Sequence, residues 1–252
     1  MKIKLTVILS LFALVAIGQH LDTPDNIRTK KGDLIVQPIT HGTVALSWNN
    51  LTIYVDPYGG AAGFEGLADP DIILITDIHG DHLDVKTLGA LNLSKAKLFV
   101  PQAVMDQLPE EIKIKATVIN NGGNTDYSGI DIAAIPMYNL PEDATSRHTK
   151  GRGNGYILTM GSKKVYLSGD TEDIPEMRSL KNIDVAFICM NLPYTMDINQ
   201  AASAVLEFKP GIVYPYHYRG KGGLSNVEAF KKQVNDGNSK IEVRLKNWYP
   251  NQ

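Results

Sequence analysis

A dense group of potential metal ligands follows one apolar run of the chain. Residues 73–84 read ILITDIHGDHLD, with three aspartates and two histidines directly after strand-forming aliphatic residues. Carboxylates within a few ångströms of one another repel, and one of them takes up a proton unless a cation lies among them. Imidazole and carboxylate together suit zinc, manganese or iron. The stretch therefore predicts a metal-binding loop whose candidate ligands are Asp77, His79, Asp81 and His82.

The rest of the chain supplies further candidate ligands in similar places. Beyond His20, five histidines remain: His41, His79, His82, His148 and His217. Four of them follow a predicted strand end or stand in a loop rich in glycine or polar residues. Asp170, in VYLSGDTED, also follows a predicted strand. Functional side chains commonly lie on loops at the ends of rigid strands. The set is large enough for two metal ions about 3.5–4 Å apart.

The elements that must position these residues are short apolar strands. The predicted strands are Leu34–Ile39, Thr43–Trp48, Leu51–Val55, Ile72–Ile75, Leu98–Val100, Ile112–Val118, Ile130–Ile135, Tyr156–Met160, Lys164–Leu167, Val185–Ile188, Ile212–Tyr214 and Ile241–Leu245. Breaks at His41-Gly42 and Asn49-Asn50 predict an antiparallel meander, the second break being a tight hairpin. The continuous apolar run Ile72–Ile75 is typical of a strand buried on both faces.

Helical patterns lie between these strands. In DINQAASAVLEFKP, Asp197 and Gln200 form a start like a capping box, an apolar stripe follows, and Pro210 ends the helix. Weaker helical patterns begin near Asp84 and at Asn226, and the polar residues 21–32 are predicted as loop. The strands form two groups, 34–135 and 156–245, each with helices. We therefore expect one α/β domain over residues 19–252, with two sheets sandwiched between helices.

The order of the motifs resembles that of the metallo-β-lactamase superfamily of metal-dependent hydrolases. DIHGDH, SRHTKGRGNGYI, LSGDT and VYPYHY follow one another between about Ile35 and His217. They are similar to the family's H-x-H-x-D-H motif, a later histidine, an aspartate in a G-D-T turn and a last histidine after a strand. The run looks most like the branch that includes ascorbate-phosphate lactonases. The resemblance implies an αββα sandwich of two mixed β-sheets flanked by helices, with the metals at one edge.

The resemblance also implies roles for the matching residues. Asp77 stands in place of the family's first histidine, a departure that adds a charge and a harder ligand. The two implied ligand sets share Asp170 and otherwise contain Asp77, His79, His148 and Asp81, His82, His217. The implied reaction is hydrolysis by a hydroxide formed from metal-coordinated water, with Asp81 and Asp170 as catalytic carboxylates. The expected cofactors are two divalent ions, zinc first, with manganese or iron as alternatives.

Two positions leave alternatives open. Asn139 stands where the family often has its middle histidine, so that His148, further along the same loop, is the expected ligand and Asn139 the alternative. Asp77 could orient a neighbour instead of binding metal, which would leave one weak site. The chain would then be a mononuclear enzyme, or a non-catalytic member of the fold that binds metal or a ligand.

Other residues lie where they could support the centre or bind substrate. His41 and Asp56 are candidates for orienting metal ligands, and a turn role is the alternative for both. The candidates for contact with substrate are Lys150, Arg152, Tyr194 and Arg219. Three of these are cations beside proposed ligand loops, which suits a phosphate or carboxylate, although a solvated surface is their usual place. The expected substrate is a small anionic ester, lactone or phosphoester.

The composition is that of an ordinary globular protein. The chain has 252 residues, 43% of them hydrophobic and 21% charged, with a formal net charge of -2. No basic balance or lysine- and arginine-rich run indicates a nucleic-acid partner, and no pattern indicates an oligomeric state. The single cysteine, Cys189, cannot form an intramolecular disulfide and is expected to be buried.

The first residues have the pattern of a secretory signal peptide. Two lysines precede an apolar stretch from Leu5 to Ile17, and small residues lead up to Gly18. We expect residues 1–18 to be a signal peptide cleaved near Gly18. The stretch is short for a membrane span, so no stable membrane anchor is expected. The mature protein would be exported to a periplasm or out of the cell.

Overall fold

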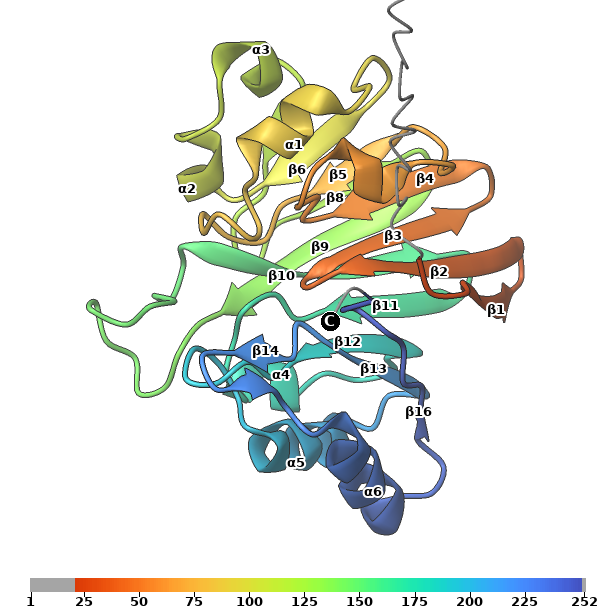
Figure 1. Ribbon diagram of the computed structural model, residues 1–252, viewed down its shortest axis with the longest axis vertical. Helices are drawn as coiled ribbons and strands as arrows, with labels where there is room; N and C mark the ends of the chain where they lie inside the picture. The colour runs from red at the N-terminus through yellow and green to blue at the C-terminus, as the bar shows by residue number, and fades with distance from the viewer. Residues whose placement is uncertain (1–20, 251–252) are drawn as a thin grey trace, which may run out of the picture.

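The computed structural model describes residues 21–250 and contains two seven-stranded β-sheets with helices on their outer faces (Figure 1). The first sheet has the order β1-β2-β3-β4-β5-β6-β7, and the second has the order β16-β13-β12-β11-β10-β9-β8. The strands β14 and β15 form a separate small hairpin. Both large sheets contain parallel and antiparallel pairs, so the αββα sandwich of two mixed sheets expected from the sequence is confirmed.

The first sheet and its helices occupy the amino-terminal half of the chain. Its strands are β1 Asp25–Thr29, β2 Gly32–Thr40, β3 Thr43–Trp48, β4 Leu51–Val55, β5 Ile72–Leu74, β6 Lys97–Val100 and β7 Ala116–Val118. A 3₁₀ helix, η1 Ala61–Phe64, and the helices α1 Val85–Ala90, α2 Gln102–Met105 and α3 Glu110–Lys113 connect them.

The second sheet and its helices follow. Its strands are β8 Asn124–Tyr127, β9 Ile130–Met137, β10 Gly153–Met160, β11 Lys163–Leu167, β12 Val185–Cys189, β13 Ile212–Tyr216 and β16 Glu242–Val243. The helices are α4 Pro175–Arg178, α5 Ile198–Phe208 and α6 Val227–Gly237, and the hairpin strands are β14 Arg219–Gly220 and β15 Gly223–Leu224.

Alternate residues of the first sheet face two different hydrophobic layers. Leu46 and Trp48 of β3 join the core shared by the two sheets, whereas Ala45 belongs to the cluster that includes residues of α1, α2 and α3. In β5, Ile72 likewise faces the shared core and Ile73 the helix layer. Successive side chains of a strand point to opposite faces, so a strand covered on both sides needs apolar residues at every position. The apolar runs in the sequence have this cause.

The strands that lead to the candidate site residues share a direction within each sheet. In the first sheet, β2 and β4 are each antiparallel to β3, and β5 is parallel to β4. In the second, β9 and β11 are each antiparallel to β10, and β12 and β13 run parallel to β11. The carboxyl ends of β2, β4 and β5 therefore lie at one edge of their sheet, and those of β9, β11 and β13 at one edge of the other.

Several details of the sequence-based expectations are confirmed. Asn49 and Asn50 both have positive φ, 50° and 64°, and connect β3 to β4 as a two-residue hairpin loop. Asp197 caps α5 by accepting hydrogen bonds from the backbone of Asn199 and Gln200, and the Gln200 side chain completes a capping box. Cys189 is buried, and burial raises the pKa of its thiol to about 11.

Other expectations about the elements were wrong. The polar stretch 21–32 is not all loop, because it contains β1, which pairs with β2. The predicted strand Ile112–Val118 is divided between helix α3 and strand β7, and the predicted strand Ile241–Leu245 is reduced to β16. The strands β8 and β9 belong to the second sheet, so the chain passes from one sheet to the other near residue 120 and not near residue 145.

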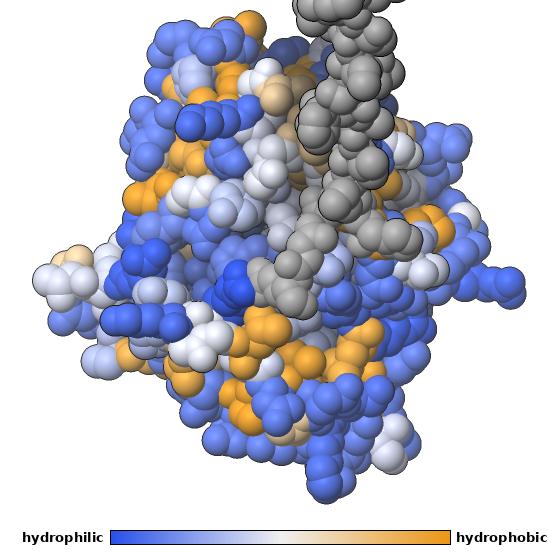
Figure 2. Space-filling model, viewed as in Figure 1, coloured by the Kyte–Doolittle hydropathy of each residue, from blue (hydrophilic) through white to orange (hydrophobic). Residues whose placement is uncertain are grey.

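The described residues contain no helix long and apolar enough to cross a membrane. Hydrophilic residues cover most of the face seen in Figure 2. The expected signal peptide, residues 1–18, lies outside the described residues, and export stays a prediction.

Candidate metal centre

The loop between β5 and α1 holds four of the candidate ligands in a compact turn. The backbone N–H groups of His82 and Leu83 both donate to the carbonyl of His79, at 2.9 and 2.8 Å. Asp84 ends the turn as the N-cap of α1, accepting hydrogen bonds from the backbone of Lys86 and Thr87. The turn is thus closed by its own hydrogen bonds and by the start of a helix, so that its side chains are held near the end of β5.

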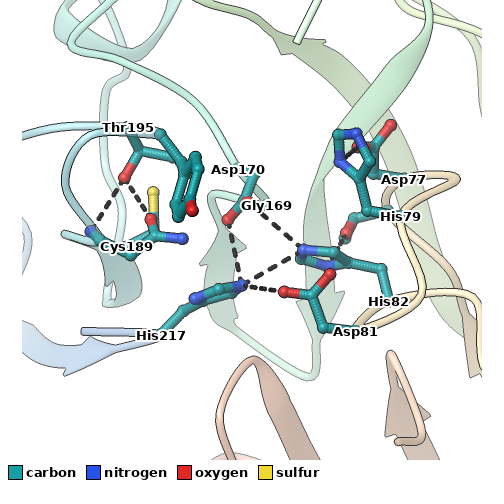
Figure 3. A network of polar contacts seen from close by, with 12 residues as sticks. Asp77, His79, Asp81, His82, Gly169, Asp170, Cys189, Thr195 and His217 are labelled. Carbon is teal, nitrogen blue, oxygen red and sulfur yellow. Dashed lines mark hydrogen bonds and ion pairs between the residues drawn. The ribbon is translucent and has the colours of Figure 1, made fainter. Parts of the chain in front are cut away.

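Asp170, which follows β11, lies at the centre of the cluster. Its carboxylate oxygens are 3.3 Å from His148 Nε2, 3.3 Å from His217 Nε2 and 3.4 Å from His82 Nε2. The Nε2 atoms of His82 and His217 are themselves 3.3 Å apart, and Asp81 Oδ2 lies 3.4 Å from His217 Nε2. Figure 3 shows the carboxylates of Asp170 and Asp81 pointing toward these two imidazole rings. All four side chains from the second implied ligand set therefore converge.

A second group of ligand atoms lies beside the first. Asp77 Oδ2 is 2.6 Å from His79 Nδ1 and 3.9 Å from His148 Nε2, and the three side chains are close enough to share one ion. Asn139 does not enter the group, because its carbonyl oxygen accepts from the backbone of His148 and its amide nitrogen donates to Glu172 and to the backbone of Tyr194. The structure thus places the His148 side chain, and not that of Asn139, among the candidate ligands.

The bonding of the cluster indicates that a cation fits it. Of the atoms that face the cluster, His148 Nε2 and Asp170 Oδ1 are buried and make no hydrogen bond to any described residue. Buried polar atoms are nearly always hydrogen-bonded, and those that are not call for another partner such as an ion. Imidazole nitrogens and carboxylate oxygens arranged with buried, unpaired atoms are the donor set that zinc and related divalent ions take. The residues present therefore fit a metal centre.

Charge inside the cluster is balanced between carboxylates and imidazoles. Burial alone would raise the pKa of Asp170, but the charges of His217 and His82 hold it well below its usual range. Burial alone would lower the pKa of His82, but Asp170 and Asp56 outweigh it and hold the pKa well above its usual range. Burial would likewise raise the pKa of Asp81, but hydrogen bonds from His217 and His41 lower it. The carboxylates are thus charged and ready to bind a cation in place of imidazole protons.

Asp56, at the end of β4, orients His82 from behind. Its carboxylate lies 2.8 Å from His82 Nδ1 and accepts hydrogen bonds from the backbone N–H and the hydroxyl of Thr76, at 2.7 and 2.6 Å. A carboxylate on one ring nitrogen fixes the tautomer and leaves the other nitrogen free for a metal. The contact is the geometry that the orienting role predicted for Asp56 requires, and the role itself stays a prediction. Thr76 was missed, although its place directly before Asp77 was a signal.

We expect Asp56→Asn to weaken metal binding by roughly 10–100-fold, the usual effect of losing such a partner. The folded state should lose about 1–3 kcal/mol, because a buried hydrogen-bonding group is left unpaired. Chelator competition and thermal unfolding of the metal-free protein measure the two effects. Asp71→Asn is the matched control, because Asp71 accepts from the backbone of Thr52 at the other end of β5. That variant should lose stability only; an equal loss of metal affinity in both would contradict the role of Asp56.

His41, in the turn between β2 and β3, supports the centre from the opposite side. Its Nε2 lies 3.1 Å from Asp81 Oδ2, and its Nδ1 lies 2.7 Å from the hydroxyl of Tyr249. Its ring packs against that of His217, with the centroids 3.8 Å apart and the ring planes tilted by 47°. The sequence indicated His41 but not Tyr249, which is 208 positions away and carries no local signal. Gly42 is required here, because a Cβ at that position would come within 2.9 Å of the His217 ring.

The four candidates for substrate contact lie in different surroundings. Arg152 binds both carboxylate oxygens of Asp77, and Lys150 pairs with Glu142 and Glu176. The ring of Tyr194 packs under the guanidinium of Arg147. Arg219 makes no ion pair to a described residue; with Thr40, His41, Tyr58 and Tyr249 it lines a hollow of about 300 Å³. Of the three cations, only Arg219 therefore lines a hollow beside the cluster with its charge uncompensated.

The fold and the cluster together define an α/β sandwich protein with a carboxylate–imidazole metal centre at one edge. A family model described as a beta-lactamase superfamily domain matches residues 36–217. A UPF0173 metal-dependent hydrolase from Pyrococcus abyssi is 31% identical over 195 residues, which is 73% of this chain and 85% of the relative. The chain belongs to the metallo-β-lactamase superfamily and is a metal-dependent hydrolase.

Solved structures agree with this assignment. A crystal structure of a candidate metal-dependent hydrolase from Parabacteroides distasonis has a TM-score of 0.78 and 37% identity, covering 89% of this chain and 98% of the other. Igni18, a metallo hydrolase from Ignicoccus hospitalis, has a TM-score of 0.72 and 23% identity, with 85% and 95% covered. The second likeness shows the fold alone.

Proposed function

We propose that the protein is a binuclear hydrolase of small anionic esters, lactones or phosphoesters. The observation that carries the proposal is the meeting of two ligand groups at Asp170, which lies within 3.4 Å of imidazoles from both. One ion would be held by Asp77, His79 and His148 and the other by Asp81, His82 and His217, with Asp170 between them. Zinc suits the imidazole-rich set best, and the carboxylate of Asp77 makes manganese or iron the alternatives.

The chain's own residues have distinct parts in this reaction. A divalent metal, when bound, lowers the pKa of a coordinated water toward about 7 and makes hydroxide available. Asp81 is partly exposed and is positioned to hold the attacking water by its proton, because His41 and His217 fix its carboxylate. Asp56 fixes His82 in one tautomer. The buried imidazoles keep bulk water away from the ligand atoms of Asp170.

Arg219 is the proposed binding group for the anionic part of the substrate. Its guanidinium lies over the ring of Tyr249, 5.3 Å from the centroid. The backbone N–H of Arg219 donates a hydrogen bond to the hydroxyl of Tyr249. The hollow it lines opens beside His41, which contacts Asp81. A substrate held here by its negative charge would have its neighbouring ester or phosphoester bond near the metal centre. The hollow beside Lys150 is less suited to an anion, because Glu142 and Asp143 line it.

We expect Arg219→Gln to raise KM for an anionic substrate by about tenfold, since a charge-assisted pair is typically worth about 1.5–3 kcal/mol when fully formed. KM for a neutral substrate of the same size should change little, and kcat should hold for both. Lys150→Gln is the matched control and should leave both KM values alone. Equal effects of Arg219→Gln on charged and neutral substrates would remove Arg219 from the substrate site.

The proposed function itself is tested by metal content and turnover together. The purified protein should contain up to two divalent ions per chain by elemental mass spectrometry. It should hydrolyse at least one member of a panel of chromogenic anionic esters, lactones and phosphodiesters. Removal of metal by a chelator should stop turnover, and zinc or manganese should restore it. A protein that takes up no metal after reloading would overturn the proposal.

A further inference from the structure

Asp77 differs from the other carboxylates of the cluster in having an arginine partner. Arg152 donates from Nε to Asp77 Oδ1 at 3.1 Å and from Nη2 to Oδ2 at 2.9 Å. The carboxylate is fully buried, and the Arg152 side chain is 20% exposed. Two parallel hydrogen bonds between a guanidinium and a carboxylate form the strongest kind of side-chain ion pair. Both oxygens of Asp77 are therefore committed to Arg152.

The oxygen that faces the neighbouring imidazoles is one of these two. Asp77 Oδ2 accepts from Arg152 Nη2 and lies 2.6 Å from His79 Nδ1 and 3.9 Å from His148 Nε2. A cation held by these three side chains would share this oxygen with a guanidinium nitrogen. It would also bind next to a fixed positive charge, which repels it strongly in a partly buried site.

The other carboxylates of the centre have no such competitor. The ion pairs of Asp170 within the described chain are with His82, His148 and His217. Those of Asp81 are with His41 and His217. An imidazole can lose its proton and coordinate the metal, whereas an arginine keeps its charge at all working pH values. The two halves of the centre therefore present different net charge to a divalent ion.

We propose that the Asp77–Arg152 ion pair makes the two metal positions unequal and sets the affinity of the weaker one. The position formed by Asp81, His82, Asp170 and His217 binds a divalent cation first and tightly. The position formed by Asp77, His79 and His148, which shares Asp170, fills second, and Arg152 competes with the metal for Asp77. Arg152 is thus a positioning residue of the metal centre. This inference rests on the proposed binuclear centre and adds the order in which it fills.

The order of filling can be measured without a substrate. Metal-stripped full-length protein is titrated with Zn²⁺ in the presence of a chelating indicator, and the two binding constants are fitted. The wild type should show two steps whose dissociation constants differ by about tenfold or more, because each 1.4 kcal/mol of repulsion is a factor of ten. Two steps of equal affinity would overturn the inference.

Two variants assign the steps to residues. Arg152→Gln should tighten the weaker step by about tenfold and leave the tighter step within about twofold, since a tenfold change corresponds to 1.4 kcal/mol. Asp77→Asn should weaken or abolish the weaker step and spare the tighter one. Asp77→Asn keeps the side-chain shape, so it tests the assignment even if Arg152→Gln fails to fold with its carboxylate partner unpaired. If Asp77→Asn weakened the tighter step instead, the assignment would be inverted and the inference wrong.

Arg244→Gln is the matched control. Arg244, like Arg152, donates two hydrogen bonds to one carboxylate, from Nε at 2.8 Å and from Nη2 at 3.1 Å, here to Glu242. Its side chain is 25% exposed, against 20% for Arg152. It lies beside β16, which pairs with the start of β13, whereas His217 follows the end of β13. This variant should leave both steps unchanged. Failure of the inference can be told apart from failure of the proposed function. If the two Zn²⁺-binding steps have equal affinity, the inference fails but the enzyme still shows turnover that a chelator stops. If the protein takes up no metal, both the inference and the proposed function fail.

Discussion

Replacement of Asp170 by asparagine is expected to release the metal and abolish hydrolysis. Asp170 is the carboxylate that lies within 3.4 Å of three imidazoles, from the loops after β5, β9 and β13. An asparagine of the same shape carries no charge and turns an amide nitrogen toward groups that also donate. The loss of metal affinity should exceed the roughly 10–100-fold that loss of an outer hydrogen-bonding partner costs. Elemental mass spectrometry after dialysis, followed by turnover with added zinc, measures the effect.

The stability of this variant separates binding from folding. The charges of His217 and His82 hold Asp170 ionised in a buried site. The asparagine removes that negative charge, and without it the pKa of His82 falls, so that the imidazole becomes neutral and no unpaired charge stays buried. The metal-free variant should therefore fold, with an unchanged circular dichroism spectrum. Asp184→Asn is the control, because Asp184 accepts from the backbone of Lys164 at the opposite end of β11. Full metal content in Asp170→Asn would show that Asp170 is not a ligand.

The sandwich could be predicted because burial on both faces leaves a pattern in the sequence. Apolar residues at every position of β5, flanked by polar turns, are typical of a strand that is covered on both sides. The capping box of α5 is equally local, since Asp197 and Gln200 contact each other within one turn. Features of this kind depend on neighbours in sequence.

The errors in the predicted elements lie where few side chains are buried or where a short apolar run is ambiguous between strand and helix. In β1 only Ile27 is buried, so an edge strand with an otherwise exposed face looks like a polar loop. Ile112 and Ile114 alternate as in a strand, yet Pro109 and the two glutamates that follow are typical of a helix start, and α3 begins there. Ile112 is buried but Ile114 is 79% exposed, so the alternation in this short run does not mark two residues that face the same core.

The local sequence pattern also could not predict to which sheet β8 and β9 belong. Ser128 and Gly129, with φ of 54° and 80°, join β8 and β9 as a two-residue hairpin loop, and neither this loop nor the strand β8 was predicted. Nothing in the hairpin itself says whether its outer strand continues the first sheet or starts the second. That choice depends on the pairing of β9 with β10, which closes the second sheet.

The candidate site likewise has a part that local sequence predicts and a part that only the structure shows. Asp77, His79, Asp81 and His82 are recognised by their spacing within one loop. The Asp77–Arg152 contact joins residues 75 positions apart, and the contact between His41 and Tyr249 joins residues 208 positions apart. A cation beside a ligand loop looks the same in sequence whether it faces substrate, solvent or another ligand. The structure resolves this by showing which carboxylate each cation contacts.

Replacement of Asp81 by alanine is expected to lower kcat by about 10²–10⁴-fold, the usual contribution of a group that handles a proton in the reaction. Among the described carboxylates of the cluster, Asp81 keeps the most solvent access, with 30% of its side chain exposed against 0% for Asp77 and 4% for Asp170, so it is the carboxylate that can reach an incoming water. Removal of the carboxylate also leaves His41 Nε2 and His217 Nε2 without their 3.1 and 3.4 Å partner. Single-turnover and steady-state rates on a substrate that the wild type hydrolyses measure the loss.

The decisive comparison is with Asp84→Ala, a carboxylate three residues further along the same loop. Asp84 caps α1 and contacts the backbone of Gly59, Lys86 and Thr87, so its loss should cost about 0.5–2 kcal/mol of stability and little turnover. Asp81→Ala should lose far more kcat than Asp84→Ala, because the Asp81 carboxylate contacts His41 and His217 and not the backbone of a helix start. Metal content must be matched by adding zinc to both. Among the described carboxylates of the cluster, only Asp81 combines solvent access with contact to both His41 and His217. Full turnover in Asp81→Ala would therefore show that no carboxylate in this position is needed to hold the attacking water.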